Sequence, residues 1–321
     1  MNILVTGGTG FVGRHLVQAL QAEGHRVLLL VRDDQRLAAC RFDPPPAVVR
    51  GDLFASAPFP PGIETVFHLA AVTKELGAGE FERINVAGTR ALLERLRPLP
   101  GLHRVLLLSS LAAAGPSRAG VPLQESDPAA PVSRYGRSKL AQERELAERS
   151  PAPWTIVRAP IVFGPGDMDM LDMFRIVGRG IAPRLGRMER WYSLIYVKDL
   201  VRGMIAAACH PSGNETFYVA NPQPVEWQEL MAQAARLLGK RALKITVPAV
   251  AGWLMAELAE LRIRAFGRRA IFNRDKFAEM RHPFWVCSAA KIGSQLHFQP
   301  RVPLITALEE TLTWYRASGL L

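Results

Sequence analysis

A tyrosine and a lysine four residues apart carry the clearest chemical signal in the sequence. Tyr135 and Lys139 belong to the run Tyr-Gly-Arg-Ser-Lys, and on a helix this spacing places both side chains on one face. A neighbouring ammonium favours the ionised form of a phenol, whose ordinary pKa is about 10. Such a phenol can exchange a proton with a carbonyl or alcohol oxygen while hydride moves at the adjacent carbon. The same spacing is common on ordinary amphipathic helices, so the chemical interpretation needs a second group.

Two serines supply that second group. Ser109 and Ser110 directly follow the apolar run 105–108, which is typical of a buried strand. A serine at a strand end can hydrogen bond the same substrate oxygen as the tyrosine and hold it in line. The structural alternative is a polar strand end or a helix cap.

Glycines near the N-terminus predict a site for two phosphates. Residues 6–13 read Thr-Gly-Gly-Thr-Gly-Phe-Val-Gly, which gives Gly7, Gly10 and Gly13 the spacing of a dinucleotide-binding turn. One glycine permits the tight turn, one lets the backbone approach a pyrophosphate, and one lets the helix pack on the strand. The start of the following helix then offers N–H groups and a positive dipole end to the phosphates. A glycine-rich turn without a ligand is the alternative.

The end of the second predicted strand bears on the choice between NAD and NADP. It reads Leu30-Val31-Arg32-Asp33. An acidic residue at this point bonds the ribose hydroxyls of NAD, whereas an arginine can pair with the 2′-phosphate of NADP. Arg32 comes first, so we expect a preference for NADP over NAD. A solvated charge pair in a loop is the alternative.

Short apolar runs and helical patterns must position these residues, and they alternate through the first half of the chain. Strands are expected at 3–5, 27–31, 48–49, 65–69, 105–108 and 154–157, and helices at 12–21, 81–96 and 135–148. Continuously apolar strands indicate a sheet covered on both faces, and the alternation indicates right-handed βαβ units. The predicted fold class is α/β, a Rossmann-type doubly wound parallel sheet with a smaller, mostly helical C-terminal substrate lobe. Residues 1–165, rejoined by 194–221, are expected to form the dinucleotide-binding domain, and residues 166–193 and 222–321 the lobe.

These motifs together resemble the extended short-chain dehydrogenase/reductase family, which includes NAD-dependent epimerases and dehydratases. The matching stretches follow the family's order and cover about the first 200 residues: 6–13, 51–53, 68–71, 85–89, 108–111, 131–139, 158–167 and 196–200. The resemblance implies that Ser110, five residues before Gly115, is the catalytic serine in preference to Ser109, with Tyr135 and Lys139 completing the catalytic set.

The resemblance also implies a set of cofactor-binding residues at the strand ends. They are Gly7, Gly10, Phe11, Val12, Gly13, Arg32, Asp52, Leu53, Leu69, Ala70, Ala71, Tyr135, Lys139, Pro160, Ile161 and Val162. Residues 52–53 would contact adenine, residues 70–71 would line the cofactor ribose, and residues 160–162 would pass beside the carboxamide. Lys139 would also hold the nicotinamide ribose.

Two departures from the nucleotide-sugar members make the expected pocket more apolar. Ile161 stands where these enzymes usually carry an asparagine, and Ala114 stands where a tyrosine is often found. The runs at 31–33 and 158–162 are more similar to the 3β-hydroxysteroid dehydrogenase and dihydroflavonol reductase branches. We therefore expect an NAD(P)-dependent oxidoreductase acting on a hydroxyl or ketone of a small, hydrophobic, sterol- or lipid-like substrate. A nucleotide-sugar epimerase or dehydratase with tightly bound NAD, and a non-catalytic NAD(P)-sensing protein, remain as alternatives.

Composition sets the remaining expectations about partners and location. Cys40, Cys209 and Cys287 are far apart and form no CxxC pair, which argues against a disulfide framework and, with the scattered histidines, against a metal site. The formal charge of +11 comes without a nucleic-acid-binding motif. Residues 247–281 combine apolar and basic residues, which fits either an interfacial helix at a membrane or an ordinary lobe helix. We expect a cytoplasmic protein without a signal peptide, with a peripheral membrane contact and homodimerisation, common in the family, left open.

Overall fold

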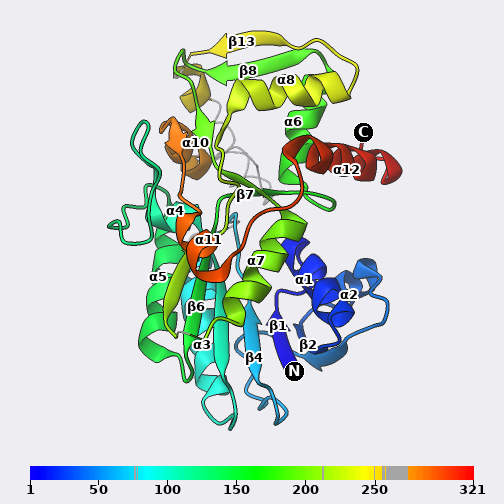
Figure 1. Ribbon diagram of the computed structural model, residues 1–321, viewed down its shortest axis with the longest axis vertical. Coiled ribbons are helices and arrows are strands. Elements are labelled where there is room, and N and C mark those ends of the chain that lie inside the picture. The colour runs from blue at the N-terminus through cyan, green and yellow to red at the C-terminus, as the bar shows by residue number, and fades with distance from the viewer. Residues whose placement is uncertain (76, 78, 212, 249, 255–256, 258–273) are drawn as a thin grey trace.

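The main body of the molecule is a seven-stranded parallel sheet (Figure 1). The computed structural model describes residues 1–75, 77, 79–211, 213–248, 250–254, 257 and 274–321. The sheet order is β11-β6-β5-β4-β1-β2-β3. Its strands are β1 (Asn2–Thr6), β2 (Arg26–Val31), β3 (Ala47–Arg50), β4 (Thr65–His68), β5 (Arg104–Ser110), β6 (Trp154–Ala159) and β11 (Glu215–Tyr218). The order reverses between β1 and β4, as in dinucleotide-binding sheets, and the predicted fold class is confirmed.

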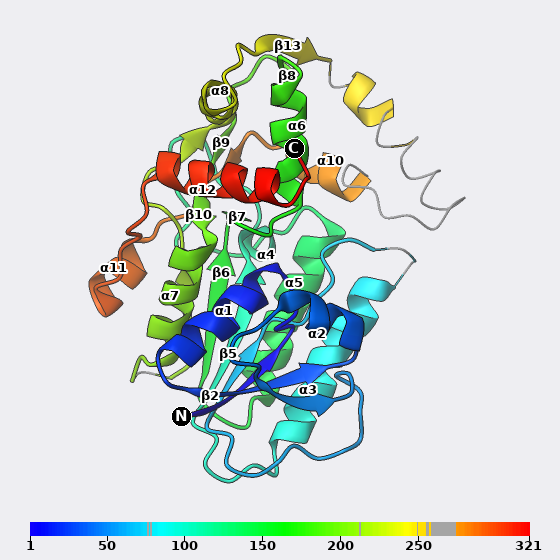
Figure 2. The same ribbon diagram turned by 90° about the vertical axis from the view of Figure 1, so that its right-hand side faces the viewer.

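Helices cover both faces of this sheet (Figure 2). One face carries α1 (Phe11–Ala22) and α7 (Val197–Ala208), and the other carries the π-helical turn η1 (Glu82–Ala87), α3 (Gly88–Leu96) and α5 (Arg134–Arg149). Side chains alternate between the two layers along β1, because Ile3 and Val5 belong to the core under α1, whereas Leu4 belongs to the core under α3. Burial on both faces explains why the strands read as continuous apolar runs.

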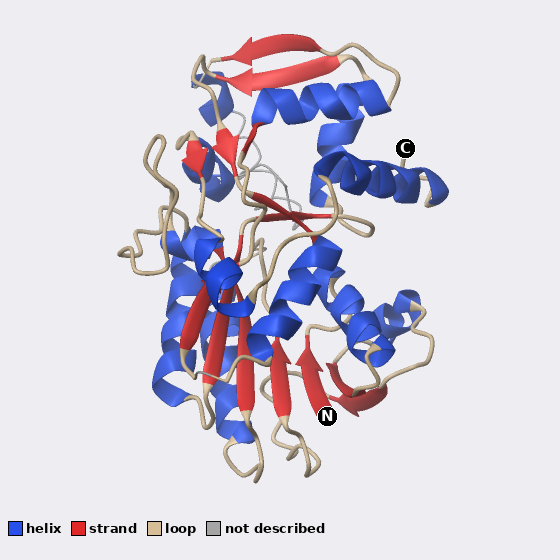
Figure 3. Ribbon diagram, viewed as in Figure 1, coloured by secondary structure: helices blue, strands red, loops and turns tan. Residues whose placement is uncertain are grey.

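A second, smaller group of elements lies beyond the carboxyl ends of the strands, toward which the arrowheads point (Figure 3). Its strands are β7 (Ile161–Phe163), β8 (Ile181–Leu185), β9 (Trp191–Tyr192), β10 (Leu194–Tyr196), β12 (Val225–Glu226), β13 (Leu243–Val247) and β14 (Phe284–Trp285). Its helices are α6 (Asp169–Gly178), α8 (Trp227–Leu237), α10 (Arg274–Met280) and α12 (Leu304–Ala317). A separate hydrophobic core, which includes Phe174, Leu230 and Leu308, holds α6, α8 and α12 together.

The structure adds elements that the sequence patterns did not predict. Helix α2 (Asp34–Cys40) follows β2 directly, α4 (Leu111–Ala114) follows β5, and α11 (Ala290–Leu296) packs beside β11. Helix α8 begins at Trp227, directly after the two residues of β12. Much of the apolar and basic segment at 247–281 lies outside the described residues, and residues 250–254 of it are helical.

Candidate active site

Helix α5 presents the predicted tyrosine and lysine at the carboxyl end of β5. Ser133 caps the helix, because its hydroxyl accepts the Gly136 N–H at 2.9 Å. A Cβ atom on Gly136 would lie 2.2 Å from the carbonyl oxygen of Ala112, so glycine is what lets α5 approach the chain that follows β5. This close packing brings Tyr135 against the end of the strand that carries Ser110.

Ser110 and Tyr135 are in direct contact. The Ser110 hydroxyl is close enough to the phenol to lower its pKa by hydrogen bonding, and the Ser110 oxygen also accepts the Ala112 N–H at 3.1 Å as the cap of α4. Ser109 is directed elsewhere, since its hydroxyl donates to Glu143, which is paired with Arg158 at 2.7 Å. Of the two serines, only Ser110 therefore faces the phenol. It also caps α4, which was the structural role that the sequence left open for these serines.

The protein's own groups raise the pKa of Tyr135. Burial is the largest cause, the hydrogen bond from Ser110 opposes it, and the carboxylates of Glu279 and Asp169 add to it. The phenol is consequently held in its protonated form, as a proton donor requires. The sequence had led us to expect that Lys139 and a bound nicotinamide lower this pKa, and that effect stays a prediction for the enzyme with its cofactor bound.

Lys139 is fully buried and held by two acceptors. Its Nζ donates to the carbonyl oxygen of Leu108 at 2.9 Å and to Oε1 of Gln142. Burial lowers the pKa of Lys139 to about 7. An ammonium has three N–H donors, so one remains for a ligand at the end of β5.

Gln142, which the sequence analysis missed, connects Lys139 to the phosphate loop. Its Nε2 donates to the hydroxyl of Thr89 at 2.8 Å, which fixes the amide so that Oε1 points at the lysine. His68 continues the chain of contacts, with Nε2 2.8 Å from the Thr89 hydroxyl and Nδ1 2.7 Å from the hydroxyl of Thr6. Burial and the charge of Lys139 lower the pKa of His68 to about 3, so this imidazole stays neutral. The network joins β1, β4, α3 and α5.

We expect Gln142→Met to shift the pH dependence of turnover to lower pH. Loss of the amide acceptor destabilises the charged form of Lys139, and a hydrogen bond to a charged group is worth about 1.5–3 kcal/mol. If the ammonium must be protonated, activity is present below its pKa and is lost as pH rises through it. The falling limb of the pH–rate profile, near pH 7 in the parent protein, should therefore move down by at least about one pH unit. An unchanged profile in a variant with native circular dichroism would contradict this role.

The glycine turn after β1 has the geometry that a pyrophosphate needs. Gly7 has a φ of +72°, and a Cβ atom there would lie 2.6 Å from the backbone nitrogen of Ala70. At Gly13 a Cβ atom would lie 2.2 Å from the carbonyl oxygen of Gly7, so the protein itself requires glycine at both positions. Gly10 differs, because it caps α1 in an extended conformation and a Cβ atom there would meet only the Gly7 oxygen, at 3.2 Å. Space in front of Gly10, at the N-terminus of a helix, fits a bound phosphate group.

A cavity of about 350 Å³ lies beside the ends of β2 and β3. Arg32 and Asp52 line it. Asp33 is used by the protein, because its carboxylate caps α2 by accepting the N–H groups of Gln35 and Arg36 at 3.0 and 3.1 Å. The carboxylate of Asp33 is thus engaged in capping α2. The Arg32 side chain is exposed and makes no ion pair with another described residue.

The other predicted cofactor residues fall along the same edge of the sheet. The Leu53 side chain is buried in the core, where it packs against Gly88, so little of it is exposed to contact a cofactor. Ala70 donates its backbone N–H to the hydroxyl of Thr6 at 3.3 Å. The remaining predicted residues are partly exposed at the starts of α1 and β7 and after β4: Phe11, Val12, Leu69, Ala71, Pro160, Ile161 and Val162.

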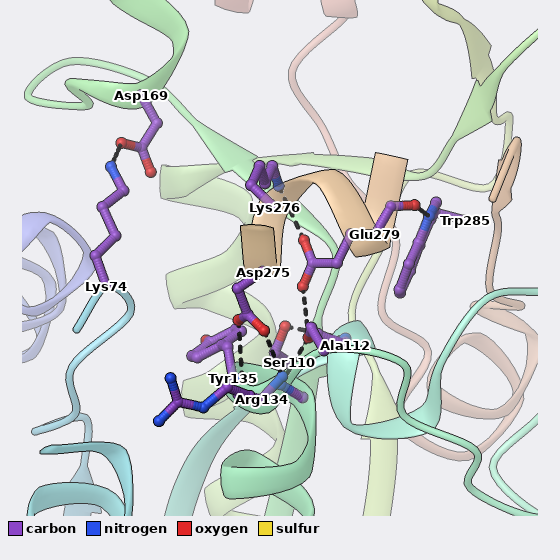
Figure 4. Close-up of polar contacts among 12 residues, drawn as sticks. Lys74, Ser110, Ala112, Arg134, Tyr135, Asp169, Asp275, Lys276, Glu279 and Trp285 are labelled. Atoms are coloured by element: carbon purple, nitrogen blue, oxygen red, sulfur yellow. Dashed lines mark hydrogen bonds and ion pairs between the residues drawn. The ribbon is translucent and has the colours of Figure 1, made fainter. Parts of the chain in front are cut away.

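Helix α10 covers the start of the catalytic helix, and its residues were not predicted to belong to the site (Figure 4). Asp275 accepts the backbone N–H groups of Arg134 and Tyr135, at 2.5 and 3.0 Å. Glu279 accepts the hydroxyl of Ser133 at 2.9 Å. The lobe is thereby bonded to the first turn of α5, where anionic side chains are favourable.

Three basic side chains near the phenol are each paired with a carboxylate. Lys74 contacts Asp169, Lys276 lies 3.1 Å from Glu279, and Arg134 lies 2.7 Å from Glu75. Arg190 is buried and donates to the backbone carbonyl oxygens of Leu185, Met280 and His282. Within the described part of the chain, the site therefore offers hydroxyl groups and apolar surface to a substrate rather than an unpaired cation for a diphosphate.

A parallel sheet with a glycine turn, and a Ser-Tyr-Lys set at the end of its fifth strand, define an extended short-chain dehydrogenase/reductase that uses a nicotinamide cofactor. The chain belongs to the NAD dependent epimerase/dehydratase family, whose model matches residues 3–220. The members of this family are enzymes. The family resemblance that the sequence predicted is therefore confirmed.

Known relatives include both reductases and epimerases. The chain is 31% identical to a ceramide reductase of Caulobacter vibrioides over 99% of this chain and 96% of the relative. It is 28% identical to a 3 beta-hydroxysteroid dehydrogenase/Delta 5-->4-isomerase of Mycobacterium tuberculosis, over 98% and 90% of the two chains. A UDP-glucose 4-epimerase of Vibrio cholerae is 30% identical over 77% of this chain and 79% of the relative. The solved structure of gox2253 is 26% identical and superposes with a TM-score of 0.80 over 99% of both chains.

The described part of the chain contains no helix with the length and apolarity needed to cross a bilayer. The same residues include no cluster of three or more histidine, cysteine or acidic side chains arranged to hold a metal ion.

Proposed function

We propose that this protein is an NADP-linked dehydrogenase or reductase that acts on a hydroxyl or ketone of an uncharged, hydrophobic substrate. The bound nicotinamide would supply or accept the hydride. Tyr135 would supply or accept the proton at the substrate oxygen. The observation that carries the proposal is the placement of Ser110 beside Tyr135, with the buried Lys139 held at the carboxyl end of β5.

The residues of the site divide the chemical work between them. Ser110 holds the substrate oxygen in line with the phenol, and Tyr135 gives up its proton as negative charge develops on that oxygen. Lys139 has one remaining N–H donor for the ribose of the cofactor or for the phenolate left behind. Because burial raises the pKa of Tyr135, the protein favours the protonated phenol that ketone reduction requires.

Two independent observations support a hydrophobic substrate. The described cations around Tyr135 already have partners, so binding a charged substrate would require breaking an ion pair. Ile161 is partly exposed at the start of β7, and its side chain cannot hydrogen bond a sugar diphosphate. A relative whose name is ceramide reductase, matched over almost its full length, points to the same substrate class.

The test is steady-state absorbance at 340 nm with NADPH and a panel of long-chain and steroidal ketones. We expect continuous NADPH oxidation with members of this panel and none with UDP-sugars. Retained nucleotide after purification, no net NADPH consumption and interconversion of UDP-sugars would instead support an epimerase. The epimerase stands as a second candidate because a UDP-glucose 4-epimerase is 30% identical to this chain.

Arg32 should determine the preference for NADP. We expect Arg32→Gln to raise the KM for NADPH at least about tenfold, since an ion pair with a 2′-phosphate is lost, while the KM for NADH changes less than about twofold. Arg26→Gln is the matched control, because Arg26 is exposed at the opposite end of the same strand. Equal changes for both cofactors would show that Arg32 does not read the phosphate.

A further inference from the structure

Strands β8 and β13 lie at the end of the lobe farthest from the sheet (Figure 1). Strands β8 and β13 pair in parallel there, with Leu243 opposite Ile181 and Ile245 opposite Pro183. Leu243 is 70% exposed, and Ile181 and Ile245 are also exposed. Ala182, on the other face of β8, is buried in the core of the lobe against α6 and α8. Strand β8 therefore packs its inner side on the lobe, whereas the outer side of the ribbon, with Ile181, Leu243 and Ile245, is apolar and exposed.

The short helix at 250–254 extends this apolar surface (yellow in Figure 2). A Cβ atom on Gly252 would lie 2.9 Å from Leu185, so the helix packs closely on the end of β8. On its outer side Val250 is 69% exposed and Trp253 and Leu254 are each 50% exposed. We call the outer residues of the ribbon and this helix the tip surface: Ile181, Leu243, Ile245, Val250, Trp253 and Leu254. Large apolar side chains gathered in this way mark a contact site rather than ordinary surface.

The chain segments that carry most of the tip surface are rich in basic residues. Residues 173–188 and residues 230–256 each contain four Lys or Arg and no Asp or Glu. Lys240, Arg241 and Lys244 are exposed next to Leu243, and Arg187 is exposed just after β8. This local excess accounts for much of the net charge of +11 of the chain.

We propose that the tip surface docks on a lipid bilayer that contains anionic phospholipids. Exposed leucine, isoleucine and tryptophan side chains insert at the boundary between headgroups and acyl chains, and flanking lysines and arginines contact the acidic headgroups. A second copy of this chain is a poor occupant, because it would place like charges against each other. The inference goes beyond the proposed function and does not depend on it, because lipid binding is measured without turnover.

Vesicle sedimentation tests the proposal directly with the full chain. We expect binding to vesicles of phosphatidylcholine mixed with phosphatidylglycerol, weak binding to phosphatidylcholine alone, and a loss of binding as salt screens the charges. The triple variant Lys240→Gln, Arg241→Gln, Lys244→Gln should weaken partitioning at least about tenfold, since each basic residue near an anionic surface adds attraction. The matched control removes three exposed basic residues of the sheet domain, Arg26→Gln, Arg97→Gln and Arg144→Gln, and should retain binding.

The apolar part of the surface needs its own variant. Leu243→Ser with Ile245→Ser should also reduce partitioning at least about tenfold, because the inserted area is lost. The control pair, Val121→Ser with Ile305→Ser, removes two side chains of comparable exposure elsewhere and should have no effect. Lipids brominated near the headgroup should quench tryptophan fluorescence, and less so in Trp253→Phe.

Three results would overturn the proposal. They are an absence of binding to the anionic vesicles, equal binding to phosphatidylcholine alone, and an equal loss of binding in the control variants. If the protein did not bind the anionic vesicles, an acidic protein would replace the bilayer as the expected partner of the tip surface.

Discussion

Replacing Tyr135 with phenylalanine is expected to reduce kcat about a thousandfold, within the range of 10²–10⁴ that general acid catalysis contributes. The phenyl ring keeps the contact with Phe81, whose ring centroid lies 5.8 Å from that of Tyr135. Only the proton donor and the bond to Ser110 are lost. The dissociation constant for NADPH should change less than about threefold, because a single hydroxyl contributes little to binding such a large ligand. Stopped-flow and fluorescence titration separate the two effects.

Tyr315→Phe is the matched control for this variant. Tyr315 is fully buried, and its hydroxyl has no hydrogen-bond partner within the described residues. Removing that hydroxyl should leave both turnover and thermal stability close to the parent values. Undiminished turnover in Tyr135→Phe would show that another group protonates the substrate, and the mechanism proposed here would fail.

Gly10→Ala is expected to weaken NADPH binding at least about thirtyfold, or about 2 kcal/mol, without unfolding the protein. The new methyl group meets only the carbonyl oxygen of Gly7, at 3.2 Å, so the chain can accept it with a small adjustment. It enters the space in front of the N-terminus of α1, where the pyrophosphate must approach the backbone. Isothermal titration measures the affinity, and a thermal melt measures the stability.

Substitutions at two other glycines serve as controls for Gly10→Ala. Gly293→Ala, in α11, meets nothing closer than 3.7 Å and should leave NADPH affinity unchanged. Gly13→Ala would place its methyl group 2.2 Å from a backbone oxygen and should destabilise the fold itself. If Gly10→Ala binds NADPH as tightly as the parent protein, the cofactor does not lie over this turn.

The sheet and the glycine turn could be predicted because their signals are local. The central strands β1, β4, β5 and β6 are buried on both faces, so their residues are mostly apolar, and the turn needs glycine for reasons that involve its immediate neighbours. Helix α2 was missed although it too has a local signal. Asp33 was interpreted as a charge beside the cofactor, whereas aspartate before a helical run is also a common N-cap.

The parts of the site that were missed depend on contacts between distant residues. Asp275 bonds a helix that begins about 140 residues earlier, and no pattern near either segment indicates the pairing. The pKa of Tyr135 rises because the folded chain buries it and brings Glu279 near, neither of which the spacing of Tyr135 and Lys139 reveals. The positioning role of Gln142 likewise depends on Thr89 fixing its amide.

These contacts also suggest how the lobe and the catalytic helix act together. Asp275 and Glu279 are hydrogen-bonded to the start of α5, so a change in the position of α10 would also change the position of Tyr135. Glu279 is one of the groups that raise the pKa of the phenol.

A crystal structure of the complex with NADP⁺ tests the central claim most directly. The account predicts that the pyrophosphate lies against Gly10 at the start of α1 and that the nicotinamide ring lies beside the hydroxyl of Tyr135, with Lys139 bonded to the adjoining ribose. A dinucleotide bound elsewhere, or a nicotinamide ring out of reach of the Tyr135 hydroxyl, would contradict it.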